Sequence, residues 1–363
     1  MAVVEITQVM SQSFWAGRRV FLTGHTGFKG AWLTLLLNRL GATVAGYALA
    51  PPTTPNLFDI AHVAGAGMNW NADIRDSATL TTHLGQFAPE VVFHLAAQSL
   101  VRESYSTPVE TFDVNVMGTV RVLDAIRRTP SVRAVVIVTS DKCYDNRETG
   151  QAYREGDAMG GHDPYSASKG CAELVTAAYG RSFFQPSVSH ASIASVRAGN
   201  VVGGGDWAKD RLLADIARGL TANEHVIIRR PDAVRPWQHV LEPLHGYLRV
   251  AENLLENGPL AWDAWNFGPD KDSEQTVEIV ARLACNIWGR PDALKIQPDL
   301  NALHEATLLR LDSTKARQRL NWRPRWDFEA TLKNTMEWYK NFAIGQDMRA
   351  FTLAQIDTYR AIT

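Results

Sequence analysis

Cysteine is scarce in this sequence. Its 363 residues include three cysteines, Cys143, Cys171 and Cys285, an odd number whose spacing does not fit a metal site. This pattern argues against a disulfide-stapled secreted fold and against a cysteine-ligated metal centre. We therefore expect reduced thiols, no metal and a cytoplasmic protein.

Long apolar runs and an excess of charge are also missing. No run approaches the roughly 18 residues that a membrane span needs. The start, M-A-V-V-E-I-T-Q-V-M, lacks the basic region and apolar core of a signal peptide. Lys plus Arg number 37 against 38 Asp plus Glu, which gives a net charge of -1. We therefore expect no nucleic-acid or membrane partner, and any anion site must be local.

The composition is that of a folded protein, with 45% hydrophobic and 21% charged residues. From Arg19 to about Arg197, short runs rich in β-branched residues alternate with helical patterns. The runs lie at 20–22, 42–47, 91–95, 134–138 and 193–197. Buried strands separated by helices predict an α/β fold with a doubly wound parallel sheet and helices on both faces.

Beyond about Asn200 this alternation loosens, tryptophan becomes more frequent, and helical patterns appear near 209–222, 239–257, 273–288 and 328–342. We predict a dinucleotide-binding domain at 14–198 and a smaller mixed α/β domain, mainly for substrate, at 199–343, with some segments interleaved. Residues 344–363 form a terminal helix or a tail.

A glycine-rich loop follows the first predicted strand. T-G-H-T-G-F-K-G carries Gly24, Gly27 and Gly30 at the spacing GxxGxxG, directly before the apolar run A-W-L-T-L-L-L. The glycines permit a tight turn and a close approach of backbone to a pyrophosphate at the helix N-terminus. The alternative is an ordinary strand-to-helix turn. The other candidate residues of this loop are His25, Thr26, Phe28 and Lys29, of which His25 and Lys29 either add charge near a phosphate or are simply solvated.

The second strand should end with an acid that binds the adenosine ribose. The segment G-Y-A-L-A-P-P-T-T-P at 46–55 offers none, so the choice between NAD and its 2′-phosphorylated form stays open. Asp73 and Ile74 follow the third strand, where an acid can meet the adenine amine, and Arg75 is available to a 2′-phosphate. Alternatively, D-I-R-D only caps the next helix.

The segment Y-S-A-S-K places Tyr165 and Lys169 four residues apart. On a helix, which the following residues favour, both side chains share one face. A tyrosine with its usual pKa of about 10 is a poor base, and a nearby ammonium lowers that pKa. Ser140 precedes the pair by 25 residues, at the exit of the strand at 134–138.

Together, the glycine loop, the hydroxyl at a strand end and YxxxK resemble the extended short-chain dehydrogenase/reductases, which act on nucleotide sugars. The resemblance covers about residues 17–340 and implies a Rossmann-type sheet that binds NAD. It also implies that H-L-A-A-Q lines the site through Leu95, Ala96 and Ala97 for the cofactor and Gln98 for the substrate, with Asn115 structural.

Longer strings are similar to those of CDP-glucose 4,6-dehydratases. These strings are G-H-T-G-F-K-G, T-S-D-K-C-Y, R-A-G-N-V-V-G-G-G-D-W at 197–207 and R-P-W-Q-H-V-L-E-P-L at 235–244. By this resemblance the substrate is a nucleotide-diphosphate sugar, CDP-D-glucose, and the product is CDP-4-keto-6-deoxy-D-glucose, a precursor of deoxysugars for a bacterial cell-surface polysaccharide.

The resemblance assigns the substrate diphosphate to Asn200 and Arg235. An amide and a guanidinium can both bind phosphate oxygens without a metal. Asp206, Trp207 and Arg211 lie where they could contact the nucleotide base. The alternatives are that Asn200 caps a turn, Arg235 is a surface charge and Trp207 fills the core.

A 4,6-dehydratase oxidises carbon 4, eliminates water across carbons 5 and 6, and returns the hydride to carbon 6. The elimination needs a nicotinamide because the ketone formed at carbon 4 makes the hydrogen at carbon 5 acidic. Tyr165 would take the proton of the 4-hydroxyl, Lys169 would lower its pKa, and Ser140 would bind the same oxygen. Asp141 would be the acid for the 6-hydroxyl and Lys142 the base at carbon 5. The dTDP-glucose dehydratases carry a glutamate at the position of Lys142. The alternative for Asp141 and Lys142 is a surface ion pair.

Three other functions remain open: a nucleotide-sugar 4-epimerase or decarboxylase, a dehydratase for a dTDP or GDP sugar, and a non-catalytic NAD(P)-sensing regulator. An epimerase has no use for an acid and an amine at positions 141 and 142. Non-catalytic regulators commonly lose the Tyr and Lys of the YxxxK motif, which this sequence keeps. The family resemblance also implies a homodimer that packs through helices near 109–128 and 164–184.

Overall fold

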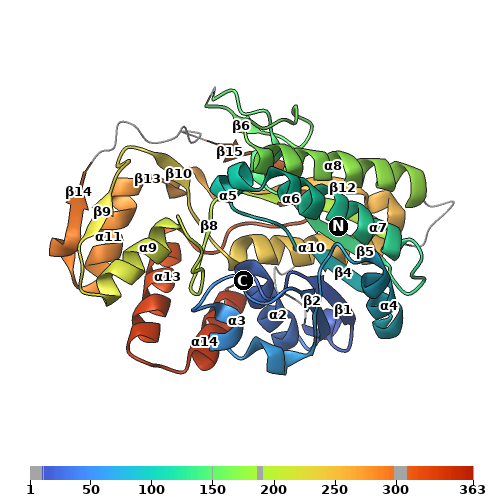
Figure 1. The fold of residues 1–363 in the computed structure, drawn as a ribbon, viewed down its shortest axis with the longest axis horizontal. Helices are drawn as coiled ribbons and strands as arrows, with labels where there is room; N and C mark the ends of the chain where they lie inside the picture. Colours follow the sequence, from blue (N-terminus) through green and yellow to red (C-terminus); the bar gives the residue numbers. More distant parts are fainter. Residues whose placement is uncertain (1–9, 11, 149, 186–190, 298–308, 363) are drawn as a thin grey trace, which may run out of the picture.

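The computed structural model describes residue 10 and residues 12–148, 150–185, 191–297 and 309–362. Its central layer is a seven-stranded sheet in the order β3-β2-β1-β4-β5-β7-β12, with every neighbouring pair parallel (Figure 1). The strands are β1 (Arg19–Thr23), β2 (Thr43–Ala48), β3 (Met68–Asn71), β4 (Val91–His94), β5 (Ala134–Val138), β7 (Ser192–Ala198) and β12 (Asp263–Phe267). The start of the chain, where we predict no signal peptide, lies outside the described residues.

The five strand runs predicted from the sequence are confirmed as β1, β2, β4, β5 and β7. Their apolar character has a simple cause, because all five are buried on both faces over their whole length or all but the first residue. β12 was not predicted, since D-A-W-N-F has no β-branched residue. The sheet is therefore the predicted Rossmann-type doubly wound sheet, extended at one edge by β12.

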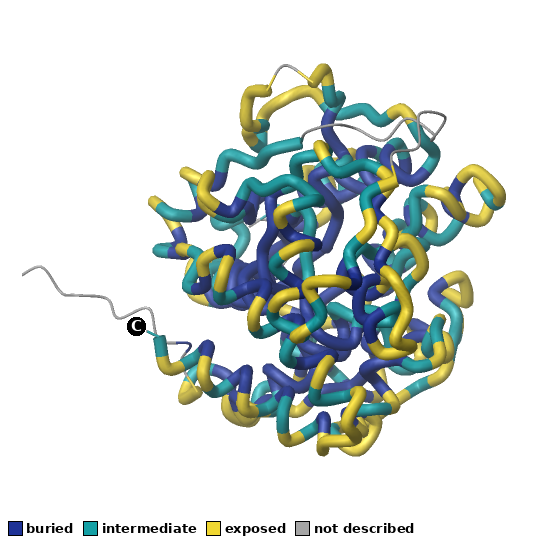
Figure 2. Tube along the Cα trace, turned by 90° about the vertical axis from the view of Figure 1, so that its left-hand side faces the viewer, coloured by how far each residue is buried: buried dark blue, intermediate teal, exposed yellow. Residues whose placement is uncertain are grey.

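Helices cover both faces of the sheet. α2 (Phe28–Arg39) and α10 (Leu241–Asn257) share one core with residues such as Val20 and Leu22. α4 (Ser77–Phe87), α7 (Gly118–Ile126) and α8 (Pro164–Phe183) lie against the other face, around Phe21. Alternate residues of β1 thus point into different cores, and Figure 2 shows the buried residues running through the middle of the molecule.

A third core lies beside the sheet layer. It is formed by α9 (Leu212–Thr221), α11 (Val277–Trp288) and α13 (Phe328–Ala343), with β9 (Val226–Ile228) next to β14 (Leu294–Ile296). Helices α9, α10, α11 and α13 confirm the four helical patterns predicted after Asn200. The part predicted as the substrate domain also supplies α10 and β12 to the sheet layer, and the proposed domain bounds stay a prediction. The C-terminal segment contains a helix, α14 (Met348–Ala361).

Short elements complete the described chain. The helical ones are α1 (Gln12–Trp15), α3 (Leu57–Ile60), η1 (Val63–Ala66), α5 (Val101–Ser106), α6 (Pro108–Phe112), η2 (Asp113–Met117), η3 (Asp141–Cys143), η4 (Gly258–Ala261), η5 (Lys271–Ser273), η6 (Pro291–Ala293) and α12 (Thr314–Arg319). The strands are β6 (Ala152–Tyr153), β8 (Val201–Val202), β10 (Val234–Pro236), β11 (Gln238–His239), β13 (Glu274–Thr276) and β15 (Arg310–Leu311). Within the described ranges, no helix is long and apolar enough to cross a membrane. All three cysteines are free thiols, as predicted.

Candidate active site

A cavity of about 1700 Å³ opens at the carboxyl ends of β1, β4, β5 and β7 and continues toward α9. Sites for single small ligands usually measure about 300–1,000 Å³, so this one has room for a dinucleotide and a second ligand. The predicted site residues that line it are Gly24, Thr26, Gly27, Phe28, Lys29, Gly30, Asp73, Ile74, Leu95, Ala96, Ala97, Ser140, Asp141, Lys142, Tyr165, Lys169, Asn200, Asp206, Trp207, Arg211 and Arg235. Over the described residues, no group of three His, Cys, Asp or Glu side chains is arranged to hold a metal ion.

The glycine loop has the tight geometry that a pyrophosphate cradle needs. Gly24 has φ +76°, and a Cβ there would lie 2.7 Å from the Ala96 backbone nitrogen. A Cβ at Gly30 would lie 2.1 Å from the Gly24 carbonyl oxygen. Gly27 precedes the first turn of α2 and supplies no side-chain cap, which leaves backbone N–H groups for an anion at the helix N-terminus.

His25 does not line the cavity, which corrects the prediction that it adds charge near a phosphate. Its ring is buried, packs edge-on against Phe58 with centroids 5.3 Å apart, and lies against Gly46. Burial lowers the pKa of His25 to about 4, so the ring is neutral at pH 7. Lys29 faces the cavity instead; burial lowers its pKa to about 8, opposed by the charge of Asp141.

At the adenosine end, Arg75 is engaged by Asp73. The Arg75 guanidinium donates three hydrogen bonds to the Asp73 carboxylate at 2.6–3.0 Å, and this contact is the main cause of the lowered pKa of Asp73. Arg75 does not line the cavity, so the structure does not favour the predicted 2′-phosphate contact. The capping alternative holds for Asp76, which accepts hydrogen bonds from the first backbone N–H groups of α4.

Ser140 and Asp141 form a buried pair directly after β5. Ser140 caps η3, with its Oγ accepting from the Lys142 backbone N–H at 3.2 Å and donating to Asp141 Oδ1 at 2.9 Å. Burial raises the pKa of the Asp141 carboxyl above its usual value, although the Lys142 charge and the Ser140 hydrogen bond oppose this. Asp141 therefore does not fit the surface ion pair that we considered as an alternative.

Tyr165 and Lys169 stand on the first turns of α8. Asp163 fixes the start of this helix by accepting from the Ser166 backbone N–H at 2.9 Å, and Pro164 takes the first helical position. Burial raises the pKa of Tyr165 to about 12, opposed by its hydrogen bond with Ser140. Lys169 is not among the causes of this shift, and its role of lowering the Tyr165 pKa stays a prediction; the Lys169 ammonium donates to the Val138 carbonyl oxygen at 3.2 Å. Burial also lowers the pKa of Lys169 to about 8.

The predicted substrate residues come from the chain after β7. Asn200 lies between β7 and β8, and Arg235 lies on β10. Arg211 Nε is 3.6 Å from Asp206 Oδ2, and burial raises the pKa of Asp206. Trp207 lines the cavity and also packs on Tyr339, with ring centroids 5.0 Å apart, so the core-filling alternative holds in part.

Gln98 does not line the cavity, so the structure does not support the predicted contact of its side chain with the substrate. Its side-chain amide donates to the Leu100 carbonyl oxygen at 3.1 Å and to Thr111 Oγ1 at 2.9 Å. The Gln98 side-chain oxygen, Oε1, accepts from the Leu100 backbone N–H. These local hydrogen bonds hold the Gln98 side chain against neighbouring residues of the same segment of the chain. Asn115 supports the same loop, since it accepts from the Gln98 backbone N–H at 2.8 Å.

Sequence reasoning missed four arginines of the cavity lining: Arg102, Arg147, Arg229 and Arg230. Arg229 and Arg230 follow β9 directly, so two adjacent cations after a strand were a usable signal. Arg102 and Arg147 carry no comparable signal in the sequence.

A family model described as GDP-mannose 4,6 dehydratase matches residues 21–335. The CDP-glucose 4,6-dehydratase of Salmonella typhimurium is 49% identical over 358 residues, which cover 98% of this chain and 99% of that protein.

Two solved structures are similar in fold. The UDP-glucose 4-epimerase of Thermotoga maritima with UDP-glucose has a TM-score of 0.77 and 20% identity, covering 89% of this chain and 99% of that one. The dTDP-glucose 4,6-dehydratase of Bacillus anthracis in complex with NAD has a TM-score of 0.74 and 18% identity, covering 91% and 99%. At this level of identity both show the fold alone, and epimerases and dehydratases share it.

Proposed function

The chain belongs to the family described as GDP-mannose 4,6-dehydratase, and from this premise we propose that it is an NAD-dependent lyase that converts CDP-D-glucose to CDP-4-keto-6-deoxy-D-glucose. The Salmonella relative supports the choice of substrate because its match spans both chains almost completely. The observation that carries the dehydration is the buried Asp141 carboxyl beside the Ser140 hydroxyl. An epimerase has no step that needs this acid.

NAD fits the glycine side of the cavity. Gly24, Gly27 and Gly30 would hold its pyrophosphate, and Asp73 and Ile74 would meet the adenine. Leu95, Ala96 and Ala97, of which the first two lie directly against Gly24, would line the cofactor site beside the glycine loop. When bound, NAD supplies reversible hydride acceptance, which lets an oxidation at carbon 4 be undone by a reduction at carbon 6.

Tyr165 takes the proton of the 4-hydroxyl, and Ser140 orients the same oxygen. With its pKa at about 12, the phenol is the favoured form of Tyr165 in this structure. A cation brought close to the phenol oxygen favours the phenolate. Lys169, one turn along α8, is that cation in the working site, where it also binds the cofactor ribose.

Asp141 and Lys142 carry out the elimination. The oxidised carbon 4 makes the hydrogen at carbon 5 acidic, and Lys142 removes it as a base. Asp141 donates a proton to the departing 6-hydroxyl, and its raised pKa favours the protonated form that this step requires. Both side chains line the same cavity as Tyr165.

Asn200 and Arg235 hold the substrate diphosphate, and Asp206, Trp207 and Arg211 contact the nucleotide base. Arg229 and Arg230 line the same cavity and add positive charge there. The CDP, dTDP and GDP alternatives differ in the base, and dTDP also lacks the ribose 2′-hydroxyl, so the contacts of the nucleoside with Asp206, Trp207 and Arg211 decide among them.

The test is turnover of four nucleotide sugars by the purified protein, with product identified by NMR. We expect a 4-keto-6-deoxy sugar from CDP-D-glucose, without net reduction of NAD, and rates at least about tenfold lower with dTDP-glucose, UDP-glucose and GDP-mannose. A C4 epimer as the product would contradict the proposal in favour of an epimerase. Absence of turnover with all four sugars would favour the regulator.

We also propose a homodimer in the cytoplasm. α6 and α7 pack on α8, and this surface exposes Val109 at 82% and Leu174 at 63%, large apolar side chains that a second copy would cover. Light scattering should give a dimer for the wild type and a monomer for Val109→Glu/Leu174→Glu. An unchanged mass in the variant would reject this surface. Cell fractionation tests the location.

A further inference from the structure

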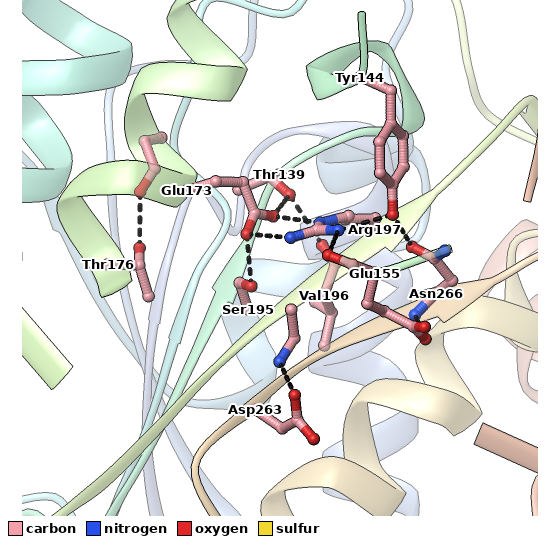
Figure 3. Close-up of polar contacts among 12 residues, drawn as sticks. Thr139, Tyr144, Glu155, Glu173, Thr176, Ser195, Val196, Arg197, Asp263 and Asn266 are labelled. Carbon is pink, nitrogen blue, oxygen red and sulfur yellow. Dashed lines mark hydrogen bonds and ion pairs between the residues drawn. The ribbon is translucent and has the colours of Figure 1, made fainter. Parts of the chain in front are cut away.

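A fully buried ion pair lies behind the catalytic segment. Glu173 of α8 accepts hydrogen bonds from Arg197 of β7, at 2.8 Å from Nε and 2.7 Å from Nη2 (Figure 3). The same carboxylate accepts from the hydroxyls of Thr139 and Ser195. The two charged side chains are 2% and 3% exposed, and the carboxylate accepts four hydrogen bonds, which matches its lone-pair sites.

The other side of the Arg197 guanidinium reaches a second group of residues. Its Nη1 donates to Tyr144 Oη at 2.6 Å and to the Glu155 carbonyl oxygen at 3.0 Å. Tyr144 Oη in turn donates to Asn266 Oδ1 of β12 at 2.8 Å. Figure 3 shows these side chains converging on Arg197 from different elements.

The position of these contacts along the chain is what matters. Thr139 and Tyr144 bracket the segment that contains Ser140, Asp141 and Lys142, so both ends of this segment are tied to the pair. Glu173 also stands one helical turn after Lys169, on the same face of α8. One carboxylate thus connects the helix that carries Tyr165 and Lys169 to the strand end that carries Ser140.

Stability alone does not explain this arrangement. Replacing a buried ion pair by apolar residues of similar volume is often neutral or stabilising. Burial raises the pKa of Glu173, but the hydrogen bonds and charge of Arg197 outweigh it, and the net pKa is lowered; both partners are therefore charged at neutral pH. The Glu173 charge favours the ammonium form of Lys169, against burial and the charge of Lys29.

We propose that Glu173 and Arg197 are positioning residues for the dehydration: they hold the Ser140–Lys142 segment against Tyr165, and Glu173 places a negative charge one helical turn from Lys169. This inference rests on the proposed function. A displacement of about 1 Å in a catalytic group can cost about 100-fold in rate, so an anchor at each end of the segment has a direct effect on turnover.

The first test compares two buried threonines, of which Thr139 lines the cavity beside Ser140 and also approaches the Val196 carbonyl oxygen at 3.3 Å. Thr139 donates to Glu173, whereas Thr176, on the same helix as Glu173, donates only to the Ala172 carbonyl oxygen of that helix. We expect Thr139→Val to lower kcat for CDP-D-glucose at least about tenfold with little change in KM. Thr176→Val should stay within about twofold of wild type. Equal kcat values for the two variants would overturn the proposal.

The second test removes the pair as a unit. Glu173→Met/Arg197→Met leaves no unpaired charge, so its Tm should stay near that of the wild type, while kcat falls by up to about 100-fold. The groups that face Lys169 are Lys29 of α2, His94 of β4, Cys143 of η3 and Glu173 itself. Loss of the Glu173 charge should move the alkaline limb of the kcat profile to lower pH. A variant with wild-type kcat and an unmoved limb would overturn the proposal.

A third readout does not depend on turnover. Hydrogen exchange of the backbone amides of residues 140–143 should be at least about tenfold faster in Thr139→Val than in Thr176→Val. If the wild type does not turn over CDP-D-glucose, the proposed function fails, and exchange alone then decides the positioning role. Equal exchange in the two variants would reject it.

Discussion

Replacing Asp141 with asparagine removes the proton donor that we assign to the 6-hydroxyl. The amide oxygen of asparagine can still accept the hydrogen bond that Ser140 Oγ donates at 2.9 Å, and its volume is nearly the same. The substitution therefore removes acid catalysis with little change in packing. Oxidation at carbon 4, which we assign to Tyr165, does not use this proton.

General acid catalysis accelerates a reaction about 10²–10⁴-fold, which corresponds to a lowering of the activation barrier by about 3–5 kcal/mol. The raised pKa of Asp141 shifts the carboxyl toward the acid form, which is the direction that this role requires. A raised carboxyl pKa also means that the folded state loses stability as the pH rises through that pKa. Asp141→Asn should therefore be at least as stable as the wild type at pH 8.

The assay is a single turnover with CDP-D-glucose, in which reduced nicotinamide and 4-keto-6-deoxy product are followed together. Asp141→Asn should accumulate reduced nicotinamide and form product about 10²–10⁴-fold more slowly. Asp145→Asn is the matched control, because Asp145 pairs with Arg147 and does not line the cavity. The acid assignment fails if Asp141→Asn forms product at nearly the wild-type rate, or if oxidation slows as much as elimination.

Further outcomes follow from the same geometry. Lys142→Met should slow release of the proton at carbon 5 into solvent by about 10²–10⁴-fold, and near-normal release would remove Lys142 from the base role. Tyr165→Phe should lower oxidation at carbon 4 by at least about 100-fold, seen as the absence of reduced nicotinamide in a single turnover. Gly30→Ala places a Cβ 2.1 Å from the Gly24 carbonyl oxygen, whereas Gly85→Ala meets no atom within 4 Å; calorimetry should show weakened NAD binding for the first only. Burial raises the pKa of Glu242 to about 7, against about 4.3 in the unfolded chain. The free energy of unfolding should therefore fall by roughly 3–4 kcal/mol as the pH rises from about 4 to above 7. Urea unfolding of Glu242→Gln should show most of this pH dependence removed.

The parts of the fold and site that were predictable rest on local patterns. The strands of the sheet read as apolar runs because both faces are buried, and the glycine loop is set by close contacts of Gly24 and Gly30 that no other residue permits. Tyr165 and Lys169 share a helix face through spacing alone. These features need no knowledge of distant segments.

The parts that were not predictable depend on contacts between distant residues. His25 is buried because Gly46 leaves room for its ring and Phe58 packs against that ring, and its sequence position in the loop gives no sign of this. The pKa of Tyr165 depends on how deeply α8 packs on the sheet. Glu173 and Arg197 are 24 residues apart and meet only because α8 covers β7.

The central claim is that hydride removed from carbon 4 returns to carbon 6 of the same sugar during loss of water. The measurement is conversion of CDP-D-glucose deuterated at carbon 4, with the product examined by NMR and mass spectrometry. The account predicts CDP-4-keto-6-deoxy-D-glucose with the deuterium at carbon 6. Deuterium that is retained at carbon 4 of an epimer, or that leaves with stoichiometric reduced cofactor, would contradict it.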